Sequence, residues 1–308
     1  MKRIKHLFKN IVSRQGLYWI LYYFFYYTNL QKFLSDELSI RLKYHCSLKK
    51  RLNLDDPKTF TEKLNWQKLY DRNPLYTKLV DKYEVKDYVA NLIGEEYIIK
   101  TLAIYDSVDQ INLDELPEKF VLKCTHDSGN IIICKDKKKL NIEEVKNKLD
   151  LGLRKNFYYD SREWPYKNVK HRIIAEEYME DEETQELRDY KFFCFDGNVV
   201  CMFVASERQK REEPFFDFFD MNFCHLDIKN GHPNSEKLPV KPKCFDLMKR
   251  LASNLSKGLP QVRVDLYEVN GKIYFGEFTF FHFGGFTPFE PEEWDYKLGS
   301  YIKLPVHY

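Results

Sequence analysis

The sequence predicts an α/β protein in which short strands, several of them paired as hairpins, alternate with amphipathic helices. Three observations predict this fold class. Apolar runs of about four to eight residues flank tight turns at Asp196-Gly197 and Asn270-Gly271. Apolar residues recur at helical spacing between such runs. The composition is 44% hydrophobic and 31% charged over 308 residues, enough for a full core and about two ordinary domains.

Residues 1–51 form a basic segment ahead of an acidic remainder. They contain eleven Lys or Arg and two acids, a net charge of +9, whereas the rest of the chain carries −7. An aromatic run from Leu17 to Tyr27 lies within this segment. Two interpretations stay open: a helix at an anionic membrane surface, or a helix whose aromatic face packs on the body of the protein.

The composition argues against several classes of protein. No apolar run reaches the about 18 residues that span a bilayer, and the aromatic run lacks a signal-peptide cleavage site. The seven cysteines are scattered without a CxxC pair, which disfavours a zinc ribbon or a disulfide framework and favours a reducing cytosol. The basic residues do not continue into a recognisable nucleic-acid-binding module, so no nucleic-acid partner is expected.

Helices are predicted after the basic segment. Thr59 and Glu62 have the spacing of a capping box and open the first of them. A second helix is predicted over 73–91, with Gly94 where its C-terminal stop belongs. Residues 96–102 then predict a strand.

The middle of the chain predicts a hairpin with a polar, glycine-containing loop. Its strands are expected over 120–124 and 131–134, joined by Thr125–Asn130. A helix over 141–156 and a strand over 172–179 follow. The last third predicts two more hairpins separated by a helix, in the order 189–195, 199–204, 245–257, 262–267 and 272–279.

Two carboxylates are predicted to meet in the last hairpin. Pairing around Asn270-Gly271 places Asp265 opposite Gly276, with Glu277 one step along. Two acids this close repel each other unless a cation lies between them, and oxygen ligands suit Mg²⁺. The alternative is a pair of solvent-facing acids on an amphipathic hairpin.

Three basic residues are candidates for binding an anion near these acids. Arg263 projects from the same strand face as Asp265, and it can clamp a carboxylate or phosphate or simply pair with Asp265. Lys123 ends an apolar strand just before the polar loop, where backbone amides could cradle phosphates. Lys191 is a further candidate, with a lysine on the wet face of a hairpin as its alternative. The polar loop lacks the Walker pattern, and a catalytic pair of Cys124 with His126 is disfavoured.

The order of these parts resembles the ATP-grasp arrangement, and more closely the TupA-like ATP-grasp family of surface-polysaccharide and teichuronopeptide gene sets. The resemblance covers about residues 40–303. The motifs that carry it are Asp56–Trp66 (DPKTFTEKLNW), Tyr70–Tyr83 (YDRNPLYTKLVDKY), Phe120–Gly129 (FVLKCTHDSG), Ala175–Met179 (AEEYM), Asp189–Gly197 (DYKFFCFDG), Arg263–Tyr267 (RVDLY) and Gly276–Thr279 (GEFT).

The resemblance implies an ATP-grasp fold of two α/β lobes that sandwich the nucleotide, behind a helical basic N-terminal segment. The implied division is 1–55 for this segment, 56–118 for an N-terminal α/β region, 119–185 for the small lobe and 186–308 for the C-terminal lobe with the metal site.

The resemblance also implies roles for individual residues. Many family members carry Asn two residues after the metal-binding Glu, and this chain has Thr279 there. The implied nucleotide contacts are Lys123, Thr125, Ser128, Gly129, Glu176, Glu177, Tyr178, Glu183 and Lys191. The implied Mg²⁺ ligands are Asp265, Glu277 and Thr279, and the implied catalytic residues are Arg263 and Lys191.

The implied activity is ATP- and Mg²⁺-dependent ligation of a carboxylate to an amine through an acyl phosphate. The expected partners are a small-molecule or glycan carboxylate, such as a uronic acid of a surface polysaccharide, and an amine. The expected location is cytoplasmic; under the interpretation in which the basic segment binds a membrane, residues 1–40 contact its inner face peripherally. Two alternatives stay open: a glycosyltransferase of polysaccharide biosynthesis and a non-catalytic ATP-grasp scaffold.

Overall fold

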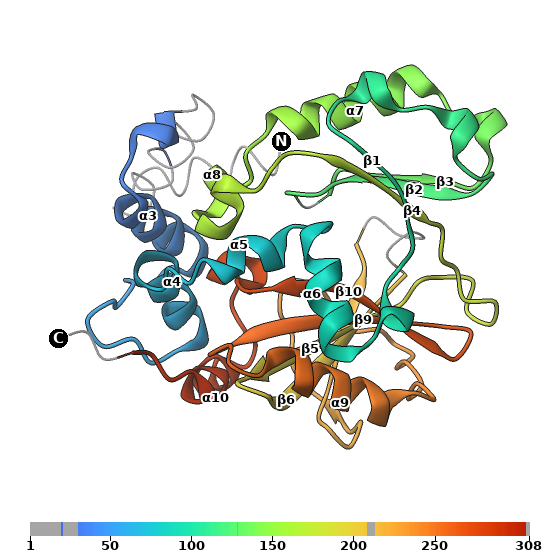
Figure 1. Ribbon diagram of the computed structural model, residues 1–308. Helices are drawn as coiled ribbons and strands as arrows, with labels where there is room; N and C mark the ends of the chain where they lie inside the picture. The colour runs from blue at the N-terminus through green and yellow to red at the C-terminus, as the bar shows by residue number, and fades with distance from the viewer. Residues whose placement is uncertain (1–19, 21–29, 128, 208–212, 306–308) are drawn as a thin grey trace, which may run out of the picture. The chain divides into compact units, whose positions relative to one another are not determined.

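A computed structural model describes residues 20, 30–127, 129–207 and 213–305 (Figure 1). Both interpretations of the aromatic run therefore concern residues that lie outside the described part, apart from residue 20. The chain divides into two compact units. The first unit comprises Met1–Arg72, Tyr159–Glu163 and Phe281–Tyr308, and the second comprises Asn73–Tyr158 and Trp164–Phe280. The four segments expected from the sequence remain a prediction.

The first unit is helical. Its helices are α3 (Asp36–Leu48), α4 (Phe60–Tyr70) and α10 (Glu293–Tyr301), with the short helices η1 (Leu30–Phe33) and η7 (His282–Gly285). The expected capping box is confirmed: Oγ1 of Thr59 accepts from the amide of Glu62 at 3.2 Å, and Oε2 of Glu62 accepts from the amide of Thr59 at 3.1 Å. The core of this unit is formed by Ile40, Tyr44, Leu52, Leu54, Trp66 and Phe286.

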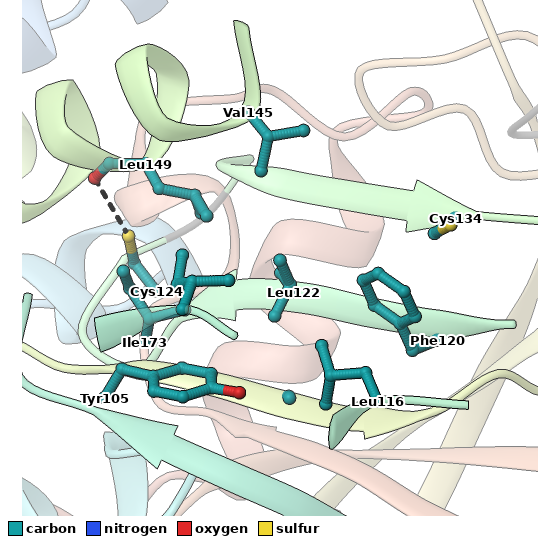
Figure 2. Close-up of a cluster of buried hydrophobic side chains, with 11 residues drawn as sticks. Tyr105, Leu116, Phe120, Leu122, Cys124, Cys134, Val145, Leu149 and Ile173 are labelled. Carbon is teal, nitrogen blue, oxygen red and sulfur yellow. Dashed lines mark hydrogen bonds between the residues drawn. The ribbon is translucent and has the colours of Figure 1, made fainter. Parts of the chain in front are cut away.

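The second unit contains a four-stranded antiparallel sheet with the strand order β1-β4-β2-β3, in which β1 (Thr101–Tyr105) is an edge strand. The expected hairpin is confirmed as β2 (Phe120–Cys124) and β3 (Ile131–Cys134), and β4 (Ile173–Glu177) is the expected strand before the acidic loop. Figure 2 shows Val145 and Leu149 of α7 (Ile142–Arg154) over the inner side chains of β2. These contacts bury one face of the sheet, including Phe120, Leu122 and Cys124.

The second unit also contains a six-stranded sheet with the order β10-β9-β5-β6-β7-β8, of which β5, β6, β9 and β10 are labelled in Figure 1. Both expected hairpins are confirmed, and helix α9 (Phe245–Ser256) follows the predicted pattern and packs on β5, β6 and β9. The strands are β5 (Asp189–Phe195), β6 (Asn198–Ser206), β7 (Phe215–Phe219), β8 (His225–Leu226), β9 (Val262–Val269) and β10 (Lys272–Thr279). The mixture of helices and antiparallel sheets confirms the α+β class expected from the sequence.

The single helix expected over 73–91 is two helices, α5 (Leu75–Val80) and α6 (Glu84–Ile93). The break occurs because Asp81 leaves the helical conformation and caps α6: its Oδ1 accepts from the amides of Tyr83 at 2.8 Å and Glu84 at 3.3 Å. Its Oδ2 pairs with Arg172 at 2.9 Å. The apolar periodicity continues across this break, so the pattern alone does not reveal it.

Two further expectations need correction. The strand expected over 96–102 begins later, because a short 3₁₀ turn (Glu95–Tyr97) precedes β1 (Thr101–Tyr105). The helices α8 (Tyr158–Ser161) and α10, and the strands β7 and β8, were not expected from the sequence. Within the described ranges, no helix combines the length and apolar character needed to cross a membrane.

Replacing Gly299 with Ala is expected to destabilise the first unit, although Ala is the better helix former. A Cβ on Gly299 would lie 2.4 Å from the carbonyl oxygen of Lys58 and 2.6 Å from the amide nitrogen of Phe60, and backbone atoms cannot rotate away. We expect urea unfolding to report a loss of about 2–3 kcal/mol. The neighbouring Ser300→Ala is the control, with an expected change within about 0.5 kcal/mol. Equal stability of both variants would contradict the close contact between α10 and the start of α4.

Candidate functional site

Charged side chains gather in two clusters in the second unit, one in each sheet. The first, called here the Glu176 cluster, consists of Glu176, Lys86 and Lys123. The second, called the Asp265 cluster, consists of Asp189, Lys191, Arg263, Asp265 and Glu277. Both rest on a carboxylate with 4% or less of its surface exposed, and buried charges require partners.

In the Glu176 cluster, one carboxylate binds two lysines, one from β2 and one from α6. Glu176 of β4 lies opposite Val121, so Lys123, two residues further along β2, shares its face. Lys123 Nζ lies 2.5 Å from Oε2 of Glu176, and Lys86 Nζ of α6 lies 2.6 Å from Oε1. Burial acts to raise the pKa of Glu176, but the charges and hydrogen bonds of Lys123 and Lys86 outweigh it and lower the pKa. The carboxylate is therefore ionised, and the cluster carries a net charge of +1.

The expected nucleotide contact Glu176 thus turns its side chain toward the lysines. Lys86 was not a candidate from the sequence. It is one polar residue on an amphipathic helix, and nothing in the periodicity of α6 shows that it reaches β4. It also donates to the carbonyl oxygen of Ile99 at 2.7 Å and to Oγ1 of Thr101 at 2.8 Å, which fixes its position.

In the Asp265 cluster, a fully buried carboxylate is held by two cations. Nε and Nη2 of Arg263 donate to Oδ1 and Oδ2 of Asp265, each at 2.7 Å, and Nζ of Lys191 bonds to the same Oδ2. Lys191 lies directly opposite Asp265 across β5 and β9, and its Nζ is 3.4 Å from Asp189. The alternative of a solvent-exposed Lys191 is wrong.

Glu277 lies directly opposite Asp265, not one step along as expected. The register between β9 and β10 shifts between Phe275 and Glu277, which makes Gly276 the extra residue of a β-bulge. A Cβ at Gly276 would lie 3.0 Å from the ring of Tyr267 and 3.1 Å from the carbonyl oxygen of Asp265, so glycine suits this close approach. The bulge brings the two carboxylates together.

The Asp265 cluster is net negative. Burial acts to raise the pKa of Asp265, but Arg263 and Lys191 outweigh it and the pKa is lowered. Glu277 is the accessible member, with 41% of its side chain exposed, and its Oε1 lies 3.8 Å from Nη2 of Arg263. With three carboxylates and two cations, the cluster carries −1 when all five groups are ionised.

Lys82 interacts electrostatically with acids of both clusters. It was not a candidate from the sequence. Its amide donates to the carbonyl oxygen of Thr125 at 3.0 Å, and its Nζ donates to the carbonyl oxygen of Asp127. Burial lowers the pKa of Lys82, and the charges of Glu277, Asp127 and Glu176 oppose this. Its position follows from the break between α5 and α6, where the chain turns toward the loop after β2.

The loop after β2 is anchored at its start. The amide of Thr125 donates to the carbonyl oxygen of Arg172 at 2.9 Å, and its hydroxyl donates to that of Lys170 at 3.2 Å. Gly129 is exposed and has a φ of +104°. Ser128, another expected nucleotide contact, lies outside the described residues.

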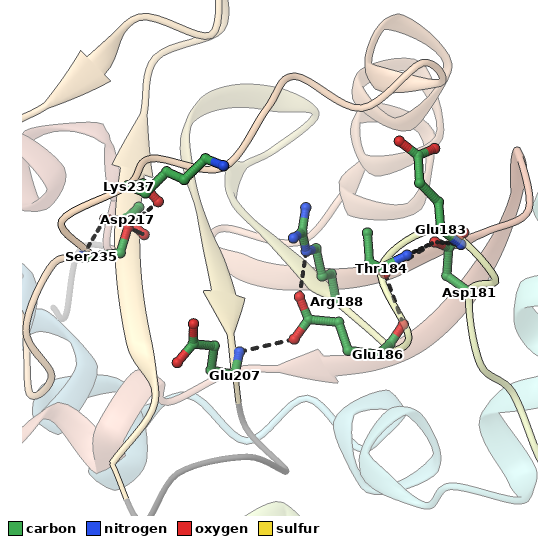
Figure 3. Close-up of polar contacts among 9 residues, drawn as sticks. All are labelled: Asp181, Glu183, Thr184, Glu186, Arg188, Glu207, Asp217, Ser235 and Lys237. Carbon is green, nitrogen blue, oxygen red and sulfur yellow. Dashed lines mark hydrogen bonds and ion pairs between the residues drawn. The ribbon is translucent and has the colours of Figure 1, made fainter.

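The remaining expected contacts lie beyond the two clusters. Glu177 is exposed, and the hydroxyl of Tyr178 donates to Glu180 at 2.7 Å. Figure 3 shows Glu183 on the loop after β4, where its side chain is 83% exposed. Asp181 has the structural role in this loop, because its carboxylate accepts from the amides of Glu183 and Asn270.

Asp265, Glu277 and Thr279 supply the oxygen donors expected for Mg²⁺. Thr279 lies opposite Arg263 and accepts from it at 2.9 Å. Among the described residues, no group of three or more His, Cys, Asp or Glu side chains is arranged to hold a metal ion. Mg²⁺ usually takes one or two protein carboxylates and completes its shell with water and phosphate oxygens. The paired carboxylates and the net charge of the cluster fit this kind of ion, provided that Lys191 leaves Asp265.

The sequence matches the model of a family described as TupA-like ATPgrasp over residues 62–303. A search of curated proteins finds no match. Among solved structures, D-alanine–D-alanine ligase from Helicobacter pylori is similar at 14% identity, with 79% of this chain and 69% of that chain covered and a TM-score of 0.44.

An L-amino acid ligase from Bacillus licheniformis is 11% identical, with 80% and 53% of the two chains covered and a TM-score of 0.41. D-alanine–D-alanine ligase from Bacillus anthracis, complexed with ATP, is 15% identical, with 66% of this chain covered and a TM-score of 0.39. The match spans 55% of the length of that ligase.

Glu176→Gln is expected to destabilise the protein in a pH-dependent way. At neutral pH the variant leaves Lys86 and Lys123 without their counter-charge, at a cost of about 3 kcal/mol in unfolding free energy. Because folding lowers the pKa of Glu176 from 4.5, its stabilising contribution is present above that value and is lost as pH falls through the folded pKa. Urea unfolding should therefore show the two proteins converging in acid. Glu177→Gln, the exposed neighbour, is the control, and a comparable loss there would contradict the account.

Proposed function

Because the chain belongs to the TupA-like ATP-grasp family, we propose that it binds ATP with Mg²⁺ and joins a carboxylate to an amine. One observation of the structure supports the proposal most strongly: a net positive cluster and a net negative cluster in the same unit. A metal–nucleotide complex offers the matching charges, phosphate oxygens for the first and a divalent cation for the second.

The Glu176 cluster is suited to phosphate. Lys123 and Lys86 are held in fixed positions by one carboxylate, so their spare N–H groups need little reorganisation to bind an anion. Lys82 adds a third cation beside the turn that starts at Thr125, and backbone amides further along this loop would add donors for phosphate oxygens. The proposed base and ribose contacts are Glu177, Tyr178 and Glu183.

The Asp265 cluster is suited to Mg²⁺, which would be held by Asp265 and Glu277, with the hydroxyl of Thr279 in reach. The ion would neutralise charge on the phosphates. Lys191 would then leave Oδ2 of Asp265 and become available to the transferring phosphoryl group. Arg263 would keep its place beside Asp265 and stabilise negative charge that develops on the substrate.

The proposed reaction has two steps. The substrate carboxylate attacks the γ-phosphorus of ATP, which releases ADP and forms an acyl phosphate. The amine then attacks the acyl carbon, phosphate leaves, and the amine loses a proton, so that an amide is formed. The protein contributes positioning and charge neutralisation through Lys123, Lys191 and Arg263, and this chemistry requires no protein nucleophile.

The proposed substrates are a uronic acid of a surface polysaccharide or its precursor, and an amine. This part of the proposal rests on the family resemblance. A lipid-linked precursor would lie at the inner face of the membrane, where the basic, aromatic segment of residues 1–40 would bring a cytoplasmic enzyme to it.

Calorimetry of nucleotide binding tests the proposal. With Mg²⁺ present, ATP should bind the native protein, and Lys123→Met should weaken binding by about 10-fold to 100-fold because one charge-assisted hydrogen bond is lost. Lys100→Met, at an exposed lysine next to β1, is the matched control and should bind like the native protein. Binding of UDP-sugars without ATP binding would overturn the proposal in favour of a glycosyltransferase. ATP binding without turnover across a panel of carboxylates and amines would favour a scaffold.

Membrane contact has a separate test on the full chain. Sedimentation with anionic phospholipid vesicles should retain the native protein at low salt and release it at high salt. Replacing Lys2, Arg3, Lys5, Lys9 and Arg14 with Gln should reduce retention by at least tenfold, since each basic residue near the surface contributes about 1 kcal/mol. Equal retention of both proteins would contradict this part of the proposal.

A further inference from the structure

Two histidines are stacked face to face beside the loop that follows β2. The rings of His126 and His171 have centroids 3.6 Å apart and an interplanar angle of 5°. His126 is fully buried, and the proposed reaction gives its side chain no role. His171 comes from the segment just before β4, so the stack joins two parts of the chain.

Both rings bond to the C-terminal end of α7. Nε2 of His126 lies 3.1 Å from the carbonyl oxygen of Gly152 and 3.2 Å from that of Lys155. Nδ1 of His171 lies 2.6 Å from the carbonyl oxygen of Leu153. Carbonyl oxygens only accept hydrogen bonds, so Nε2 of His126 and Nδ1 of His171 each carry a proton. This assigns the tautomer that each ring has in its neutral form.

Protonation of Nδ1, the second ring nitrogen of His126, is unfavourable in this packing. This nitrogen is buried and has no hydrogen-bond partner among the described residues. Burial lowers the pKa of His126 from 6.5, the charge of His171 lowers it further, and Asp127 and the two carbonyl bonds oppose this. These are the charged or titratable groups that act on the ring, since α7 faces it with backbone carbonyls. The neutral ring is therefore the form that this packing accepts.

The ring anchors the start of the proposed phosphate-binding loop. Thr125 and Asp127 flank His126, and Lys82 binds the carbonyl oxygens of both. A movement of the His126 ring would therefore shift the backbone of Thr125 and Asp127 on either side of it, and with them the carbonyl oxygens that orient Lys82. Protonation would place a charge on a buried nitrogen without a partner among the described residues, in a ring stacked on a second imidazole with the centroids 3.6 Å apart.

We propose that His126 is a positioning residue for the nucleotide: as a neutral ring clamped between His171 and the end of α7, it sets the turn at Thr125–Asp127, and protonation in acid releases this turn. The inference rests on the proposed nucleotide binding at that turn. It makes the affinity for ATP fall as pH drops through the pKa of His126, which burial holds below 6.5, the ordinary value for histidine.

The test is the dissociation constant of ATP with Mg²⁺, measured by calorimetry from about pH 8 to about pH 5. His126→Gln keeps an amide donor for the α7 carbonyls but cannot be protonated. We expect native affinity to fall about tenfold between neutral and acid pH, and that of His126→Gln to fall about twofold or less. His126→Ala should bind weakly throughout. His225→Gln, at an exposed histidine of β8, is the control and corrects for titration of ATP itself.

A parallel pH profile in the native protein and His126→Gln would overturn the proposal. Nitrogen NMR of the native protein provides a test that needs no variant: His126 should be neutral with its proton on Nε2 at neutral pH. A protonated ring or the opposite tautomer would also overturn it. Failure of the proposed function is distinct, because it appears as absence of ATP binding at neutral pH, whatever the state of His126.

Discussion

The second unit depends on two buried carboxylates, Glu176 and Asp265, that each hold a pair of cations. Ionised side chains lose several kcal/mol of hydration when they are buried, and only close partners offset this loss. Lys86 and Lys123 meet Glu176 within 2.6 Å, and Arg263 meets both oxygens of Asp265 at 2.7 Å. Removing either acid would take the closest counter-charge from two cations, so neither acid is replaceable by an apolar residue alone.

The backbone irregularities of the unit serve these pairs. The break at Asp81 ends α5 and directs Lys82 to the loop after β2, while α6 presents Lys86 to Glu176. The bulge at Gly276 moves Glu277 opposite Asp265. Each irregularity departs from a regular helix or ladder at a point where a charged side chain must meet a partner far away in the sequence. The helix and the strand ladder are therefore irregular at the points where charge pairs between distant parts of the chain form.

The sequence predicted most of the strand pairing because turn chemistry is local. Asn270-Gly271 and Asp196-Gly197 each locate a hairpin to within a residue. The bulge was not predicted, because a single Gly within a strand pattern does not show whether, or where, the cross-strand register shifts. The helix break was missed because the apolar periodicity continues across Asp81, and Arg172, which pairs with Asp81, lies 91 residues away.

The candidate site was predicted unevenly for the same reason. Lys123, Lys191, Arg263 and Asp265 were singled out because charged residues are unusual within apolar strands, and all four lie in the two clusters. Lys82 and Lys86 were not, since a lysine on a helix is ordinary until its partner is known. Other expected nucleotide contacts, such as Glu177 and Tyr178, have side chains that carry no comparable signal.

In the proposed function, the negative Asp265 cluster binds the metal that accompanies ATP. Electron paramagnetic resonance of Mn²⁺ in the presence of a non-hydrolysable ATP analogue measures this directly. We expect one tightly bound Mn²⁺ ion, and only when the ATP analogue is present. The affinity for Mn²⁺ should be at least about tenfold lower in Glu277→Gln. It should be unchanged in Glu293→Gln, a variant of an exposed acid in the first unit. Equal Mn²⁺ affinity in the native protein and Glu277→Gln would contradict metal binding at the Asp265 cluster.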